Sequence, residues 1–232
     1  MALRRRNGQS ITQRLTPEEQ EARRQAGISP AYRGNLSIPR NHSAQIPEDE
    51  NCSIFITGLP GDCTVHTVLR ALHGTGVGRV YFCHINRPQD DSNRPGRTTA
   101  AAKLVFFEAA SASGFLQRHA NEGFAVDGYH IQAVYNRNRV AEAPERKNVT
   151  RVLIISGPKE VVHEEVLEKL FRGHFEYQMD GPVITWGETE TDRCLEWRFG
   201  SYRAQAQAAC LFMRQNGIFS RVKVIYGQDP CA

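Results

Sequence analysis

The chain has 232 residues, of which 40% are hydrophobic, and it carries a formal net charge of +4 with a mean hydropathy of −0.48. This length suits two small domains and a tail, and no stretch approaches the roughly 18 apolar residues of a membrane helix. The basic start at residues 1–6 has no apolar segment after it, so we expect no secretory signal.

The charge is unevenly distributed along the chain. Residues 51–140 contain 9 Lys and Arg against 6 Asp and Glu, whereas residues 141–232 contain 12 against 13. Because contact with phosphates needs a surplus of Lys and Arg, the middle block is the better candidate for a polyanionic partner.

The 6 cysteines form no C-x-x-C pair and no zinc-site spacing, so we expect neither a metal nor a cofactor. Most lie in apolar runs and are interpreted as buried, reduced thiols. Reduced thiols without disulfides indicate a nuclear or cytoplasmic protein and not a secreted one.

Residues 1–50 are rich in Arg, Glu, Gln, Ser and Pro, and such a segment buries too little apolar surface to offset its ordering entropy. We therefore predict a disordered, basic and polar tail, with a linear motif or a strap docked on the first domain as the alternative. A short helix is predicted at 17–26, with Thr16 as N-cap, Glu19 as capping-box acid and Gly27 as the stop.

The block 51–140 alternates short apolar runs with amphipathic stretches. One apolar helical face is formed by Val65, Val68, Leu69 and Leu72. A second apolar helical stripe runs from Ala109 to His119. The predicted strands are 53–57, 79–85, 101–107 and 129–135. The resulting order, β-α-β-β-α-β, defines a ferredoxin-like unit in the α+β class.

A polar linker at 141–150 precedes a second block, 151–228, with the same order of elements. Strands are predicted at 151–155, 182–186, 193–199 and 221–226, and helical stripes lie at 167–174 and 204–212. Phe175, Trp186 and Trp197 are expected in the core of this block. Two successive units of one architecture form a tandem repeat.

The first block resembles the RNA recognition motif (RRM) family, whose fold is also called the nucleotide-binding alpha-beta plait. The segment IFITGL at 54–59 resembles the family's hexamer motif, with Gly58 in place of Asn. The segment AAAKLVFF at 100–107 aligns with the octamer motif through Val105 and Phe107. This alignment puts the family's two stacking positions at Ala102 and Leu104.

The second block resembles the same family less closely, through VLIISG at 152–157 and DRCLEWRF at 192–199. Its two stacking positions fall at Cys194 and Glu196, where a carboxylate would repel phosphate. The whole layout, tail included, resembles that of fungal RRM proteins.

The resemblance implies that single-stranded RNA binds across the sheet of the first block, where aromatic rings stack on bases. If Ile54 and Ile56 face the helices, alternation along the strand turns Phe55 and Thr57 outward. By the same parity, Ala102, Leu104 and Phe106 face outward. The predicted RNA-binding residues are Phe55, Thr57, Tyr81, Leu104, Phe106, Arg94, Arg97, Arg137 and Arg139.

Each of these assignments has a purely structural alternative. The aromatic residues could pack in the core, a one-residue slip would reverse the face of Tyr81, and the arginines could be solvated surface. The nearby Lys103 is interpreted as a side chain that snorkels at a strand end.

Three functions are compared. The first is single-stranded RNA binding by the first RRM, with the second structural or auxiliary. The alternative is an RRM-like module that binds a protein or peptide. An enzyme is not expected, because no nucleophile elbow, phosphate loop or dinucleotide fingerprint is present.

Overall fold

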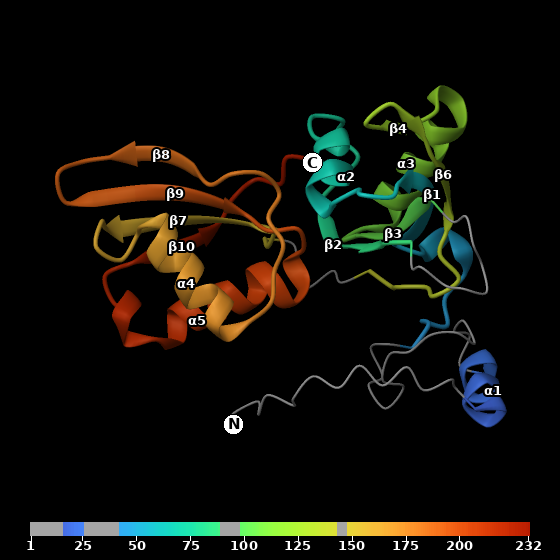
Figure 1. Cartoon of the computed structure of the whole chain (residues 1–232), viewed down its shortest axis with the longest axis horizontal. Helices are drawn as coiled ribbons and strands as arrows, with labels where there is room; N and C mark the ends of the chain where they lie inside the picture. Colours follow the sequence, from blue (N-terminus) through green and yellow to red (C-terminus); the bar gives the residue numbers. More distant parts are fainter. Residues whose placement is uncertain (1–15, 26–41, 89–97, 143–147) are drawn as a thin grey trace.

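The computed structural model describes residues 16–25, 42–88, 98–142 and 148–232. It contains two folded domains side by side, each with a four-stranded antiparallel sheet and two main helices (Figure 1). The α+β class and the tandem RRM fold that the sequence predicts are confirmed.

The first domain follows the order β-α-β-β-α-β, with a small hairpin before its last strand. Its sheet has the strand order β2-β3-β1-β6. The elements are β1 (Ser53–Pro60), α2 (Val65–Leu72), β2 (Val80–Asn86), β3 (Thr99–Phe106), α3 (Ala109–Glu122), β4 (Ala125–Val126), β5 (Tyr129–His130) and β6 (Gln132–Tyr135).

Both helices of the first domain pack on one face of its sheet. The predicted stripe of α2 is buried, and Thr64 caps this helix in a reciprocal pair with Thr67. Facing it, Ile54 pairs with Leu104 and Ile56 pairs with Ala102 across β1 and β3, all fully buried. In the described part of the chain, neither helix of this domain covers the opposite face of the sheet (Figure 1).

The second domain repeats this arrangement with the sheet order β10-β7-β9-β8. Its elements are β7 (Val152–Pro158), α4 (Glu164–His174), β8 (Ile184–Glu188), β9 (Asp192–Arg198), the irregular turn η4 (Tyr202–Ala206), α5 (Gln207–Gln215), the 3-10 turn η5 (Gly217–Phe219) and β10 (Lys223–Tyr226). Its core is strongly aromatic, with Phe171, Trp197 and Phe199 fully buried.

The expected short helix is present as α1 (Pro17–Gln25). Thr16 and Glu19 form the predicted capping box, with the Glu19 amide 3.2 Å from the Thr16 hydroxyl and the Thr16 amide 2.8 Å from the Glu19 carboxylate. Residues 1–15 and 26–41, including the expected stop at Gly27, lie outside the described residues, so the prediction of a disordered tail is not addressed there.

Residues 42–50, which include the 3-10 turn η2 (Glu48–Glu50), form a strap on the first domain. The Ala44 amide donates to the carbonyl oxygen of Arg139 at 3.0 Å, and the Ser43 hydroxyl donates to the carbonyl of Arg137 at 3.2 Å. The docked strap was the alternative interpretation of the tail, and it holds for this segment.

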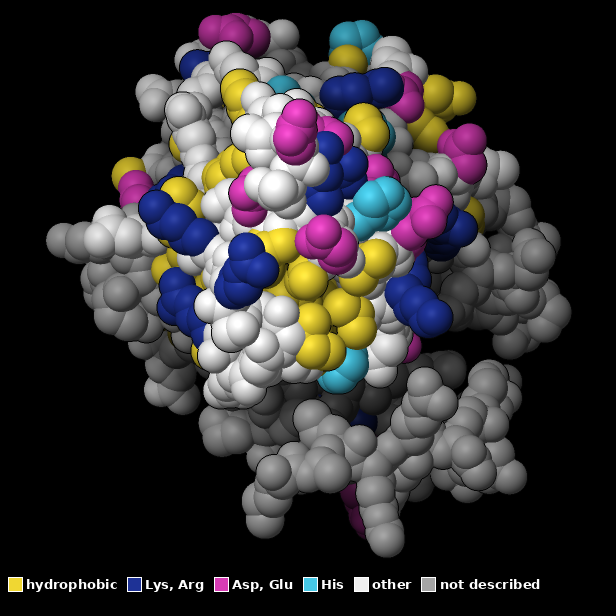
Figure 2. All heavy atoms as spheres, turned by 90° about the vertical axis from the view of Figure 1, so that its left-hand side faces the viewer, with side chains coloured by type: hydrophobic (Ala, Val, Ile, Leu, Met, Phe, Trp, Pro, Cys, Tyr) yellow, Lys and Arg dark blue, Asp and Glu magenta, His cyan; other side chains and the backbone are white. Residues whose placement is uncertain are grey.

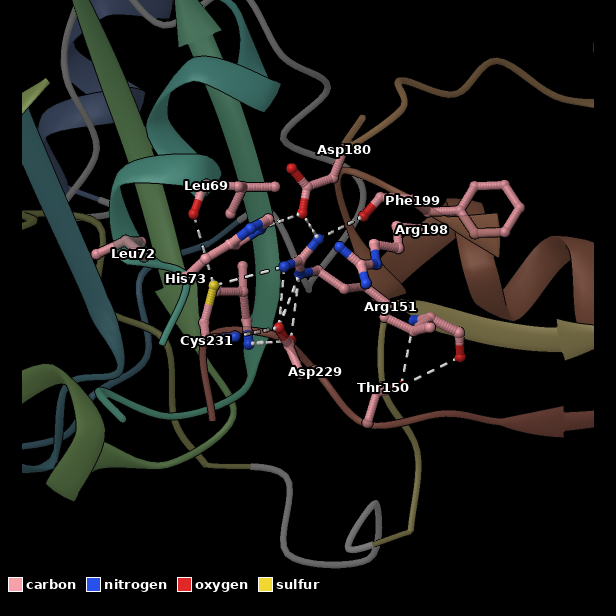
Figure 3. A network of polar contacts seen from close by, with 12 residues as sticks. Leu69, Leu72, His73, Thr150, Arg151, Asp180, Arg198, Phe199, Asp229 and Cys231 are labelled. Carbon is pink, nitrogen blue, oxygen red and sulfur yellow. Dashed lines mark hydrogen bonds and ion pairs between the residues drawn. The ribbon is translucent and has the colours of Figure 1, made fainter. Parts of the chain in front are cut away.

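A buried ion-pair network joins the two domains (Figure 3). Arg151, at the start of the second domain, is fully buried and lies 2.6 Å from Asp180 and 2.9 Å from Asp229. From α2 of the first domain, His66 and His73 contact the two oxygens of Asp180 at 2.9 and 2.8 Å. Burial alone would raise the pKa of Asp180, but the Arg151 charge and these hydrogen bonds hold it below its usual value.

The segment after β10 turns back into the first domain. Asp229 accepts from the Val80 amide at 2.9 Å, and the Cys231 carbonyl accepts from the Gly78 amide at 3.0 Å. The Cys231 side chain is fully buried in the core cluster of the first domain. The last strand of one domain therefore leads directly into the core of the other.

The backbone of the second domain at Gly200 also lies close to a side chain of the first domain. A Cβ atom there would lie 2.7 Å from the Cγ1 atom of Val65 on α2. A side chain at this position would therefore require the Val65 side chain or the Gly200 backbone to shift.

We expect Arg151→Ala to lower the free energy of unfolding by about 3–5 kcal/mol, because it leaves two buried carboxylates without their cation. Urea denaturation followed by tryptophan fluorescence measures this loss. Arg214→Ala removes an exposed arginine of α5 and should change stability by less than about 0.5 kcal/mol. Equal stability of the two variants would show that the network does not stabilise the docked domains.

Candidate nucleic-acid interface

The open face of the first sheet carries one row of side chains across all four strands. Phe55 on β1 pairs with Val134 on β6 and with Lys103 on β3, and Lys103 pairs in turn with His84 on β2. Side chains directly opposite on neighbouring strands have Cβ atoms about 5 Å apart. A phenyl ring, an ammonium group and an imidazole thus lie in sequence on an accessible surface.

Phe82 adds a second phenyl ring to this face. Its ring centroid lies 6.2 Å from that of His84, with 20° between the ring planes. An irregularity in the pairing of β2 with β3 at Tyr81 shifts the alternation, so that Phe82 and His84 face the open side. The face therefore presents two phenyl rings and an imidazole on its open side.

The prediction that Leu104 and Phe106 face outward is wrong. Leu104 is 0% exposed and Phe106 is 1% exposed, in the core beneath the helices together with Ala102. Because Leu104 pairs with Ile54 and Lys103 pairs with Phe55, the predicted parity of β3 was off by one residue. Lys103, interpreted as a strand-end side chain, instead lies near the centre of the open face.

Phe55 and Thr57 are partly exposed on the open face, as the parity of β1 predicts. Tyr81 lies elsewhere, because its ring packs against Phe107 and against Tyr202 of the second domain, with centroids 5.3 and 5.9 Å away. Tyr81 therefore belongs to the contact between the domains and not to the platform.

Of the four arginines predicted to bind phosphate, the structure describes two. Arg94 and Arg97 lie outside the described residues. The Arg139 guanidinium donates to the carbonyl of Ile46, which ties it to the strap, and the side chain of Arg137 is exposed. Of the four, only Arg137 is seen as an accessible cation.

The electrostatics of the open face centre on Lys103. Burial, and then the nearby charge of Arg203 from η4 of the second domain, lower the pKa of Lys103 to about 8. No described carboxylate forms an ion pair with either side chain. This face therefore has a cationic centre, and none of the described carboxylates is paired with it.

The corresponding row of the second domain has a different chemistry. From β10 through β7 and β9 to β8, the row consists of Ile225, Ile154, Glu196 and Ile184. Aliphatic side chains replace the phenyl and imidazole groups, and a carboxylate takes the place of Lys103. The expectation that Glu196 occupies this face is met, and the row lacks both a stacking ring and a cation.

Trp186 was predicted in the core of the second domain, and this prediction is wrong. Its side chain is 66% exposed, and its indole N–H donates to Glu196 at 2.7 Å. Glu196 also accepts from Arg198, so its charge is paired. Trp197, by contrast, is 1% exposed in the core as expected, and Phe175 is partly buried against that core.

The end of the second domain farthest from the first shows both charge signs. Apolar side chains gather near its centre, with Lys and Arg interspersed with Asp and Glu around them (Figure 2). Such a surface lacks the one-signed basic potential that attracts a phosphate backbone.

No family model and no curated protein matches this chain. Similar solved structures include the first two RRM domains of the yeast poly(U)-binding protein Pub1, at 12% identity and a TM-score of 0.31 over 76% of this chain and 99% of that one. RRM domains 1 and 2 of Sex-lethal from Drosophila melanogaster match at 16% identity and a TM-score of 0.26, over 76% and 100% of the two chains.

The third RRM domain of Mip6 matches at 14% identity and a TM-score of 0.30, over 40% of this chain and 99% of that one. All three are structures of RRM domains. At these identities no functional conclusion follows from them.

Two further observations bear on partners. No helix in the described ranges is long and apolar enough to cross a membrane. Those ranges also contain no group of three or more His, Cys, Asp or Glu placed to hold a metal ion.

The corrected parity of β3 leads to a stability prediction. Leu104→Ala should destabilise the protein by about 2–5 kcal/mol, because it empties a core position, whereas Lys103→Ala should change stability by less than about 0.5 kcal/mol. Thermal or urea denaturation of both variants tests this order. If Lys103→Ala cost more than Leu104→Ala, the register of β3 described above would be wrong.

Proposed function

We propose that this protein binds single-stranded RNA on the open sheet face of its first domain. The observation that carries the proposal is the row of Phe55, Lys103 and His84, with Phe82 beside it. Phenyl rings stack on bases whatever the sequence, and the ammonium group attracts the phosphate that links them.

The second domain has a structural or auxiliary role in this proposal. Its open face replaces the aromatic and cationic row with isoleucines and a paired glutamate. A face of this composition contributes neither stacking in that row nor phosphate neutralisation.

The proposal describes a binding protein and not an enzyme. It places the protein in the nucleus or cytoplasm, where single-stranded RNA occurs. The six cysteines are free thiols, which supports a reducing compartment.

Phe55→Ala and Phe82→Ala should each weaken RNA binding by about 1–3 kcal/mol, the value of one base–ring stack. Fluorescence anisotropy of the whole chain with a short labelled single-stranded RNA of mixed sequence measures the dissociation constant. Tyr129→Ala is the matched control, since Tyr129 is 54% exposed on β5 and away from this row. If Phe55→Ala and Phe82→Ala bind as tightly as Tyr129→Ala, the platform is assigned incorrectly.

The lowered pKa of Lys103 predicts a pH dependence of RNA binding. Free Lys103 loses its proton near pH 8, whereas a bound phosphate favours the ammonium form and keeps it protonated to a higher pH. Above pH 8, binding must therefore take up a proton, and affinity should fall by up to about tenfold for each pH unit.

Lys103→Arg provides the comparison for this effect, because a guanidinium stays charged across the whole range. The same anisotropy titrations from pH 7 to pH 9 should give a nearly constant affinity for this variant. An equally steep fall in Lys103→Arg would mean that another group causes the pH dependence.

One observation favours a second candidate function, the binding of a protein or peptide by the second domain. Its open face exposes Trp186, 66% accessible, and Ile225, 47% accessible, next to a carboxylate that is already paired. A partner that survives nuclease treatment and is lost in Trp186→Ala would support this function. A partner lost on nuclease treatment would instead be bridged by RNA.

A further inference from the structure

The turn η4 of the second domain is fixed against the first domain. The Ser201 hydroxyl accepts from the Cys83 amide at 3.0 Å and lies 3.2 Å from the Cys83 carbonyl oxygen, so it pairs with the outer edge of β2. The ring of Tyr202 packs against Tyr81 and Phe107 of the first domain. The residues immediately before Arg203 are therefore held against the strand that carries Phe82 and His84.

The backbone of η4 departs from a helix at Arg203 and Ala204. Arg203 is extended, with φ −62° and ψ 129°, and Ala204 has a left-handed conformation, with φ 62° and ψ −2°. Residues with a Cβ atom disfavour this conformation, and it persists where surrounding contacts impose it, often at ligand sites. The break moves Arg203 off the path that a continuous helix would give it.

Arg203 directly follows the residues that contact β2, the edge strand of the first sheet. Its charge acts on Lys103, which lies opposite His84 on β3, one residue beyond the Cys83 that Ser201 contacts. Two cations from different domains thus lie near one another, and neither forms an ion pair with a described carboxylate. An anion between them would relieve their mutual repulsion.

We propose that Lys103 of the first domain and Arg203 of the second domain together bind one phosphate of a single-stranded RNA. This inference rests on the proposed function, and it makes the RNA site complete only when the two domains are docked. The stacking rings Phe55 and Phe82 belong to the first domain, and the second cation is supplied by the second.

A site shared in this way links RNA binding to domain docking. Because RNA would bind the docked arrangement more tightly, it would also stabilise that arrangement by the same factor. The charges of Lys103 and Arg203 repel one another when no anion is bound. In the docked arrangement both charges are then already in place to bind the phosphate.

The test uses the whole chain and a short labelled single-stranded RNA of mixed sequence, titrated by anisotropy at several salt concentrations. Arg203→Ala should raise the dissociation constant about tenfold, the effect of one charge-assisted contact. It should also lower the slope of log affinity against log salt by about 0.7, the value for one phosphate on a single strand. Arg221→Ala, an exposed arginine of the same domain, should change neither quantity.

A double mutant tests whether both cations hold the same phosphate. If they do, Lys103→Ala combined with Arg203→Ala should weaken binding by less than the product of the two single effects. Arg203→Lys keeps the charge and should keep the salt slope. Near-ultraviolet circular dichroism of each variant identifies any loss of packing.

The possible failures are distinguishable. If Arg203→Ala binds as Arg221→Ala does while Phe55→Ala and Phe82→Ala are weakened, the shared site is refuted and the proposed function stands. If the unmodified chain binds no RNA even at low salt, the proposed function fails, and the shared site fails with it. A weakened Arg203→Ala with an unchanged salt slope would also overturn the inference, because the lost contact would not be ionic.

Discussion

The buried Arg151 is the interaction on which the arrangement of the molecule depends. Its guanidinium contacts Asp180 and Asp229, which in turn contact α2 and β2 of the first domain. Removing these charges from water is costly, and the cost is offset only while every partner is in place. The network therefore favours one docked arrangement over alternatives that would leave a buried charge unpaired, and a polar linker alone would give no such preference.

The two domains share a fold but differ in the chemistry of their open faces. Where the first has Phe55, Lys103 and His84, the second has Ile154, Glu196 and Ile184. The same backbone frame thus presents a cationic, aromatic row in one copy and an aliphatic, charge-paired row with Trp186 beside it in the other. Because fold does not determine function, the proposed division of roles follows from these rows of side chains.

The sequence predicted the fold well and the site only in part. Helical stripes and apolar runs located the elements, because burial follows periodicity. The residues of β3 that face outward were mispredicted because its run of Ala, Leu, Val and Phe is apolar on both faces. Alternation of polar and apolar residues therefore does not distinguish the buried face from the open face in this strand. Lys103 was the one signal of the true register.

Phe82 was missed because the irregularity at Tyr81 reverses the parity of β2. The effect of the Arg203 charge on Lys103 depends on domain docking, which no local sequence pattern predicts.

The segment after β10 has a consequence for how the chain is made. Cys231 lies in the core of the first domain, although the ribosome adds it only after the whole second domain has been synthesised. Domains in multidomain chains generally fold as units in the order of synthesis. Here the first domain stays without part of its core until the second has emerged. The first domain, although it is synthesised first, therefore completes its core only when the last residues of the second block are in place.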